Sequence, residues 1–163
     1  MTSTTESAPA EGLELQPAER EVLSAEVLPF AATLPDPALR ARYEELHAAV
    51  QTGSVPPALV GLVEALAELV LQTQRVRRRH GPEAERALTA LYYRTPRGAR
   101  LRQSAQEVNE ALAVLHGQVL EELTFAPTPG GQRLTITTQQ CRLEVAIDRA
   151  GVRVERVELG SVV

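Results

Sequence analysis

Apolar residues recur at helical spacing along most of the chain and alternate with polar residues near its end. After Asp36 they follow one another at intervals of four, three and four residues: Leu39, Tyr43, Leu46 and Val50. This spacing places them on one face of a helix. Asp36 can cap the helix, Pro37 suits its first position, and Gly53 can end it in the left-handed conformation. We therefore predict a helix from Asp36 to about Gly53.

Two further helices are predicted between residues 56 and 94. The first runs from Pro56 to about Arg79, and its apolar stripe is wide enough to be packed from two sides. The stripe consists of Leu59, Leu62, Val63, Leu66, Leu69, Val70 and Val76. Gly81 and Pro82 end this helix and begin the next, which runs to about Arg94.

A heptad pattern follows and predicts a fourth helix. Its apolar positions alternate between spacings of four and three: Leu101, Ala105, Val108, Leu112, Leu115 and Val119. Two starts are open, because Thr95 and Pro96 offer an N-cap and a first position, whereas Ser104 with Glu107 matches a capping box. A sustained heptad seam is typical of helices that pair with another helix. The residues expected to mediate self-association are Leu101, Val108, Leu112, Leu115 and Val119.

After Leu123 the apolar period changes to two, which predicts strands with one packed face and one wet face. The longest alternating set is Cys141, Leu143, Val145 and Ile147. Turn signals lie at residues 128–131 and 148–151. In the last strand the alternation slips near Glu155, which indicates a β-bulge.

These elements predict an α+β fold: a helical bundle of about four helices followed by a C-terminal antiparallel β-meander of three or four strands. The helical region covers residues 36–122, and the β-meander of residues 123–163 packs on it. Residues 1–16 are expected to form a disordered acidic tail. Residues 17–35 form a linker that can hold a short amphipathic helix. This helix either caps the core or is a linear motif that docks on a partner or on the chain's own Arg-rich segment.

Composition narrows the class of protein further. The chain has 163 residues, of which 44% are hydrophobic and 3% aromatic, so we expect one domain plus a tail with a core of Leu, Val and Ala. The single cysteine, Cys141, excludes an intrachain disulfide and fits a reducing compartment. Neither a secretory signal nor a membrane-spanning run is evident. These features favour a cytoplasmic protein.

A basic middle segment lies between two acidic flanks. Residues 71–102 contain nine Arg and two Glu, a charge of +7, whereas residues 1–70 carry −8 and residues 103–163 carry −3. If the fourth helix begins at Thr95, arginines crowd its positive end, which usually prefers anions. The arginines therefore either bind an external anion or pair with the chain's own carboxylates. The candidate anion or nucleic-acid site consists of Arg75, Arg78, Arg79, Arg94, Arg97, Arg100 and Arg102, with Tyr92 and Tyr93 placed to stack on bases.

No constellation of residues indicates catalysis. His47, His80 and His116 lack the spacing of metal ligands, and Cys141 lies in phase with the packed face of its strand, where a thiol is inert. We expect no metal and no cofactor. The sequence favours a non-enzymatic, self-associating interaction or scaffold protein that acts through amphipathic helices. The alternative is an accessory protein that binds nucleic acid or another polyanion through residues 75–102. The expected partners are a second copy or another protein, with nucleic acid as the alternative and no membrane.

Overall fold

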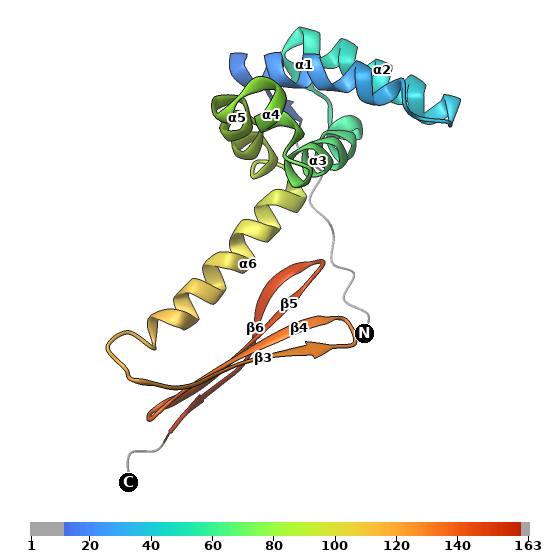
Figure 1. Cartoon of the computed structure of the whole chain (residues 1–163). Coiled ribbons are helices and arrows are strands. Elements are labelled where there is room, and N and C mark those ends of the chain that lie inside the picture. Colours follow the sequence, from blue (N-terminus) through green and yellow to red (C-terminus); the bar gives the residue numbers. More distant parts are fainter. Residues whose placement is uncertain (1–11, 161–163) are drawn as a thin grey trace, which may run out of the picture. The chain divides into compact units, whose positions relative to one another are not determined.

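The computed structural model describes residues 12–160, and the chain divides after Ala99 into two compact units (Figure 1). Within the described residues, six helices precede a four-stranded antiparallel sheet. This arrangement confirms the predicted α+β class. None of the helices in this part of the chain is long and apolar enough to cross a bilayer. The units are described separately below.

Five of the six helices begin at a proline, whose missing N–H would have no partner in the first helical turn. The helices are α1 (Pro17–Ala31), α2 (Pro37–Thr52), α3 (Pro57–Gln72), α4 (Arg75–His80), α5 (Pro82–Tyr92) and α6 (Pro96–Ala113). The predicted ends of α2 are confirmed. Asp36 accepts a hydrogen bond from the N–H of Ala38, and Gly53 adopts a φ of 87°.

Helix α1 packs against α2 and α5 in the core of the first unit. Its residues Val22, Leu23 and Val27 are buried, so this helix is part of the core. Before it, strand β1 (Leu13–Glu14) pairs with β2 (Ser54–Val55). Order therefore begins earlier than the tail predicted for residues 1–16, of which residues 1–11 lie outside the described part.

The single helix predicted from Pro56 to Arg79 is divided into α3 and α4. Gln74 adopts a left-handed conformation with a φ of 54° and interrupts the helix. The hydroxyl of Thr73 donates to the carbonyl of Leu69 at 2.8 Å, which satisfies one of the acceptors at the end of α3. After the break Val76 is fully buried. The arginines of residues 75–79 consequently lie on a short helix of their own.

Helix α6 begins at Pro96, which decides between the two predicted starts. The hydroxyl of Thr95 accepts a hydrogen bond from the N–H of Gly98, as an N-cap does. The helix ends at Ala113, and Gly117 follows with a φ of 77°. The helical region therefore ends earlier than the predicted residue 122, and Val119 lies beyond α6 with 70% of its surface exposed.

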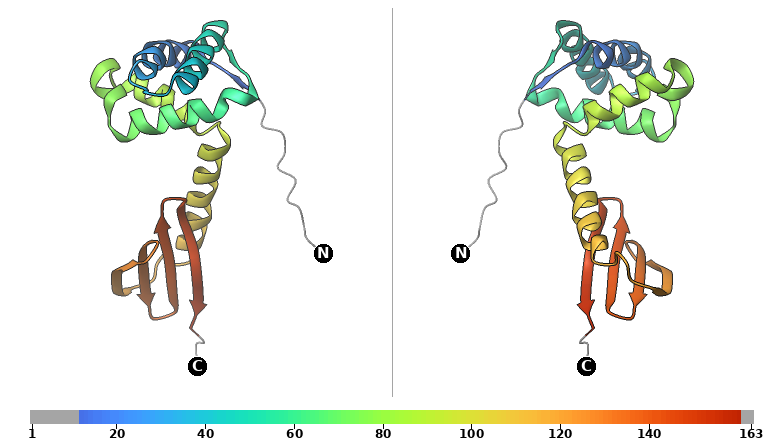
Figure 2. Two further views of the ribbon diagram at one scale, coloured as in Figure 1. Left: turned by 90° about the vertical axis from the view of Figure 1, so that its right-hand side faces the viewer. Right: turned by 90° about the vertical axis from the view of Figure 1, so that its left-hand side faces the viewer.

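The second unit contains a meander of β3 (Leu120–Thr128), β4 (Gly131–Thr138), β5 (Cys141–Asp148) and β6 (Gly151–Leu159) in consecutive order. Within this unit α6 packs on one face of the sheet (Figure 2), where Val108 meets Ile136, Leu143 and Val145. The predicted bulge is confirmed. Val154 pairs with Val145 and Arg156 pairs with Glu144, which leaves Glu155 as the additional residue.

A substitution at Gly98 tests the close approach of α6 to the end of α5. A Cβ atom there would lie 1.9 Å from the carbonyl oxygen of Tyr92, and a backbone atom cannot move aside cheaply. We expect Gly98→Ala to lower the free energy of unfolding by about 3 kcal/mol in urea titrations followed by circular dichroism.

Gly61→Ala is the matched control, because Gly61 lies inside α3 and a Cβ atom there would meet open space. We expect it to raise stability by about 0.5–1 kcal/mol, since alanine restricts the unfolded chain more than glycine does. Equal stability of the two variants would contradict the contact.

Candidate functional site

A buried carboxylate on α1 gathers three basic side chains of the arginine-rich segment. The side chain of Glu26 is only 1% exposed. Its Oε1 lies 2.8 Å from Nε2 of His80 and 3.6 Å from a guanidinium nitrogen of Arg79. Its Oε2 lies 2.8 Å from Nε of Arg75 without hydrogen-bond alignment, so this contact is an ion pair only. We call these four residues the Glu26 cluster.

The Glu26 cluster joins α1 to α4. A carboxylate that leaves water needs charged partners and hydrogen bonds to offset the loss of hydration. Because a carboxylate only accepts hydrogen bonds, His80 donates from Nε2. Arg75 and Arg79 are thereby engaged with a carboxylate of their own chain.

A second glutamate on α1 engages Arg94 in the same way. Glu19 is buried and accepts from the guanidinium of Arg94 and, at 2.8 Å, from the N–H of Gln16. Arg94 also donates to the carbonyl of Glu14 at 2.9 Å. This arginine therefore ties β1 and the first turn of α1 to the end of α5.

The start of α6 meets two carboxylates of α3. The N–H of Arg97 donates to Glu64 at 2.7 Å, and its guanidinium donates to Glu68 at 3.0 Å. Glu64 and Glu68 are four residues apart, so they lie on one face of α3. The positive helix terminus that we considered as an anion site thus already receives anions from the first unit.

The two tyrosines beside these arginines differ in access. Tyr92 is buried, and its hydroxyl has no hydrogen-bond partner within residues 12–160. Burial raises the pKa of Tyr92, and the charge of Glu68 raises it further. Tyr93 is exposed, and its ring centroid lies 6.1 Å from that of Tyr92. Tyr93 is therefore accessible for stacking on a base, whereas Tyr92 is not.

The remaining candidate arginines fall in separate places. Arg75, Arg78 and Arg79 line one hollow of about 460 Å³ with Leu69 and Val70. Arg100 and Arg102 are exposed on the part of α6 that belongs to the second unit. Arg78, Arg100 and Arg102 form no ion pair within the described part of the chain. The structure brings together three of the seven candidates.

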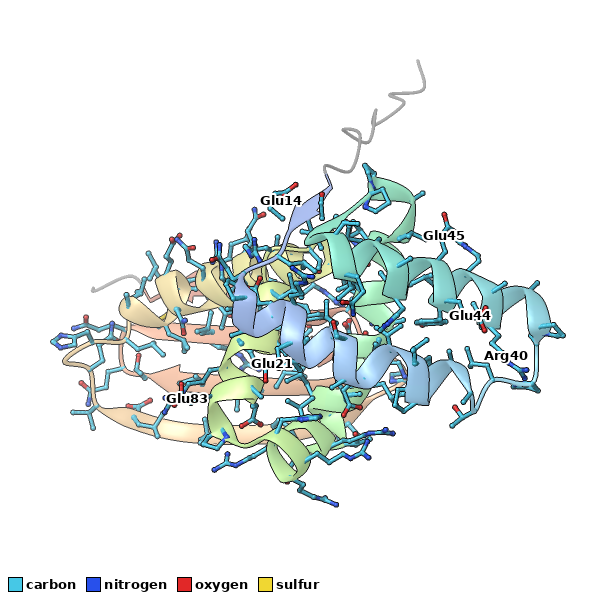
Figure 3. All side chains as sticks on the ribbon, turned by 90° about the horizontal axis from the view of Figure 1, so that it is seen from above. Glu14, Glu21, Arg40, Glu44, Glu45 and Glu83 are labelled. Atoms are coloured by element: carbon cyan, nitrogen blue, oxygen red, sulfur yellow. The ribbon has the colours of Figure 1, made fainter. Side chains whose placement is uncertain are left out.

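A groove of about 610 Å³ runs between α1 and α5 beside the Glu26 cluster. Alanines form much of its lining, and Glu21 and Glu83 contribute carboxylates to it (Figure 3). His80 reaches the groove but is held by Glu26. Across residues 12–160 no group of acidic, histidine or cysteine side chains is arranged to hold a metal ion.

The second unit leaves part of an apolar face uncovered. Leu123 and Phe125 on β3 are 59% and 57% exposed, although they pair with Ile136 and Leu134 of the core below α6. On β6, Leu159 is 68% exposed and lies opposite the buried Cys141. We call the exposed residues Leu123, Phe125, Val157 and Leu159 the apolar margins.

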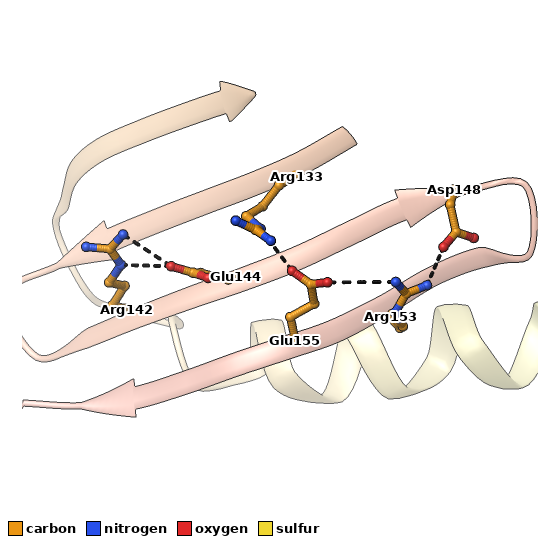
Figure 4. Close-up of polar contacts among 6 residues, drawn as sticks. All are labelled: Arg133, Arg142, Glu144, Asp148, Arg153 and Glu155. Carbon is orange, nitrogen blue, oxygen red and sulfur yellow. Dashed lines mark hydrogen bonds and ion pairs between the residues drawn. The ribbon is translucent and has the colours of Figure 1, made fainter. Parts of the chain in front are cut away.

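The opposite face of the sheet is polar and carries ion pairs within and between its strands (Figure 4). Arg133 contacts Glu155 at 2.9 Å, and Arg153 contacts both Asp148 and Glu155. The guanidinium of Arg153 and the N–H of Ala150 hold the pKa of Asp148 below its usual value. The acidic and basic side chains of this face thus pair with one another.

The heptad seam turns toward the chain's own sheet. Val108 is buried there, and Leu112 and Leu115 are partly buried against the same cluster. Leu101 is half-buried beside Gly151, and Val119 lies beyond the end of α6. The seam therefore already has a covering surface.

Sequence reasoning missed the Glu26 cluster and the apolar margins. The margins had a signal, because four alternating strands present more apolar positions than one helical seam can cover. No sequence signal marked Glu26, because the sequence does not distinguish a buried glutamate within an apolar stripe from a solvated one. Comparison of the chain with protein-family models, curated proteins and solved structures gave no match.

Removing the charge of Glu26 tests the role of its cluster. We expect Glu26→Gln to lower the free energy of unfolding by about 2 kcal/mol, less than for a fully buried pair because Arg75 and Arg79 are partly exposed. Urea titration measures the loss. The control is Glu83→Gln, whose carboxylate is 81% exposed beside Arg86 and should change stability by less than about 0.5 kcal/mol. Similar effects of the two substitutions would contradict a structural role of Glu26.

Proposed function

We propose that the chain is a non-enzymatic, self-associating interaction protein, and that its sheet supplies the contact surface. The observation that supports this most is the exposure of Leu123, Phe125 and Leu159 on the same face as a packed core. Exposed apolar groups that gather beside a core are typical of protein contact sites. The proposal keeps the self-association expected from the sequence and transfers it from the heptad seam to the sheet.

The geometry of the unit explains why these residues stay exposed. A helix with its side chains is about 10 Å wide. Four strands spaced by about 4.8 Å extend over about 14 Å between the outer strand axes, and their side chains reach farther. One helix can therefore cover the inner strands β4 and β5, whereas the margins of β3 and β6 need a second apolar surface.

Binding of nucleic acid has weaker support. Arg75, Arg79, Arg94 and Arg97 contact glutamates of the first unit, and Tyr92 is buried. A phosphate would have to compete with carboxylates that are already in place. Few arginines remain for phosphate contacts, and affinity grows with the number of phosphates that a protein neutralises.

Sedimentation equilibrium tests the proposal. We expect reversible association of the whole chain at about tens of micromolar, a free energy of about −6 kcal/mol. Replacing the apolar margins with Leu123→Ser and Phe125→Ser, or with Val157→Thr and Leu159→Ser, should weaken association. The control is Leu28→Ser, which changes a leucine of α1 that is also exposed and should leave association unchanged.

A monomer at every concentration would contradict the proposal. Salt-sensitive binding of a labelled oligonucleotide in fluorescence anisotropy, lost in Arg78→Glu and Arg102→Glu variants, would favour the nucleic-acid alternative instead.

A further inference from the structure

Strand β6 is an outer strand with an open edge. It is nine residues long and pairs only with β5 within residues 12–160. Its sequence has no proline, so no N–H is missing from the open edge, and it carries equal numbers of Arg and Glu. Open edges of this length are templates for another strand. The charged residues and the bulge of β6 usually protect an edge, so only a strand that matches both can pair with it.

We infer that β6 pairs antiparallel with β6 of a second copy, about a twofold axis between Glu155 and Arg156. This inference rests on the proposed self-association and identifies its contact. In this register each of residues 152–159 meets a complementary one. The pairs, each formed twice, are Val152 with Leu159, Arg153 with Glu158, Val154 with Val157 and Glu155 with Arg156. Opposite charges and apolar groups that face each other across strands stabilise the pairing, and like charges there destabilise it.

The bulge makes this register possible. In a regular strand neighbouring residues point to opposite faces, so residues 155 and 156 could not lie opposite each other in one continuous sheet. At the bulge both side chains lie on the polar face. Glu155 contacts Arg133 there, and Arg156 lies opposite Glu144 and contacts Glu158. Two copies of β6 carry the same additional residue at the same place and therefore stay in step.

The register also covers the margin of β6. Val157 would lie opposite Val154 of the second copy, and Leu159 opposite Val152. Val152 and Val154 already pack against the core cluster beneath α6. The exposed leucine and valine of one copy would thus extend the core of the other, and the two packed faces would become one.

The other edge of the sheet is a poorer candidate. Strand β3 contains Pro127, which cannot donate to a neighbouring strand. It also contains Glu121 and Glu122 and no basic residue, so a second β3 would offer these carboxylates no opposite charge. Pairing of β3 with β6 of another copy would leave one β3 edge and one β6 edge unpaired at the ends of the assembly. Further copies could then add there, so a filament would form instead of a closed pair.

A charge-exchange experiment tests the register. In Arg153→Glu homodimers two Glu–Glu contacts replace two Arg–Glu contacts, and Glu158→Arg produces two Arg–Arg contacts. We expect each variant alone to dimerise at least about tenfold more weakly than the unchanged protein in sedimentation equilibrium. An equimolar mixture should recover dimerisation to within about threefold, because every charged pair between the two variants is again opposite.

Recovery on mixing separates the interface from folding, because a variant that fails to fold is not rescued by another variant. The double variant Arg153→Glu with Glu158→Arg is a second check, and it should dimerise with itself. If the charge substitutions left dimerisation unchanged while Leu123→Ser and Phe125→Ser abolished it, the β6 register would be overturned and self-association would stand. A monomeric unchanged protein would overturn both, and association only with a different protein would overturn the inference of a second copy.

Discussion

The burial of two glutamates on α1 is the constraint around which the helical unit is arranged. Glu19 and Glu26 leave water only because Arg94, on one side, and Arg75, Arg79 and His80, on the other, reach them. These contacts fix α1 against both ends of residues 75–94. A third contact, from Arg97 to Glu68, anchors the start of α6. Four arginines of the segment that is most basic in the sequence, Arg75, Arg79, Arg94 and Arg97, thus contact glutamates of the first unit.

This arrangement changes the meaning of the charge pattern. A basic segment between acidic flanks looks in the sequence like a surface for polyanions. In the folded unit the acidic residues of α1 and α3 are the partners of the basic ones. Charge segregation along a chain can therefore serve internal pairing across long sequence separations, as between Glu26 and Arg75.

Local rules predicted the elements that depend on neighbouring residues. The ends of α2 followed from Asp36 and Gly53, and the bulge at Glu155 followed from a slip in the alternation. No glycine or proline marks the break at Gln74 in the sequence, and β1 is too short to show an alternation of apolar and polar residues. Spacing identified the apolar side of α6 but favoured a second helix, and not the sheet, as its cover. Val119 continued that spacing although the helix had already ended at Ala113. The Glu26 cluster depended on packing of distant segments, which no local pattern contains.

The tight turn between β4 and β5 has a practical consequence. Cys141 begins β5, is buried, and donates its N–H to the hydroxyl of Thr138 at 2.9 Å, which closes the turn. It is the sole thiol of the chain. A thiol reagent can modify it only when this part of the sheet opens, so the rate of labelling follows the population of the opened state. The labelling rate of Cys141 thus measures how often this part of the sheet opens.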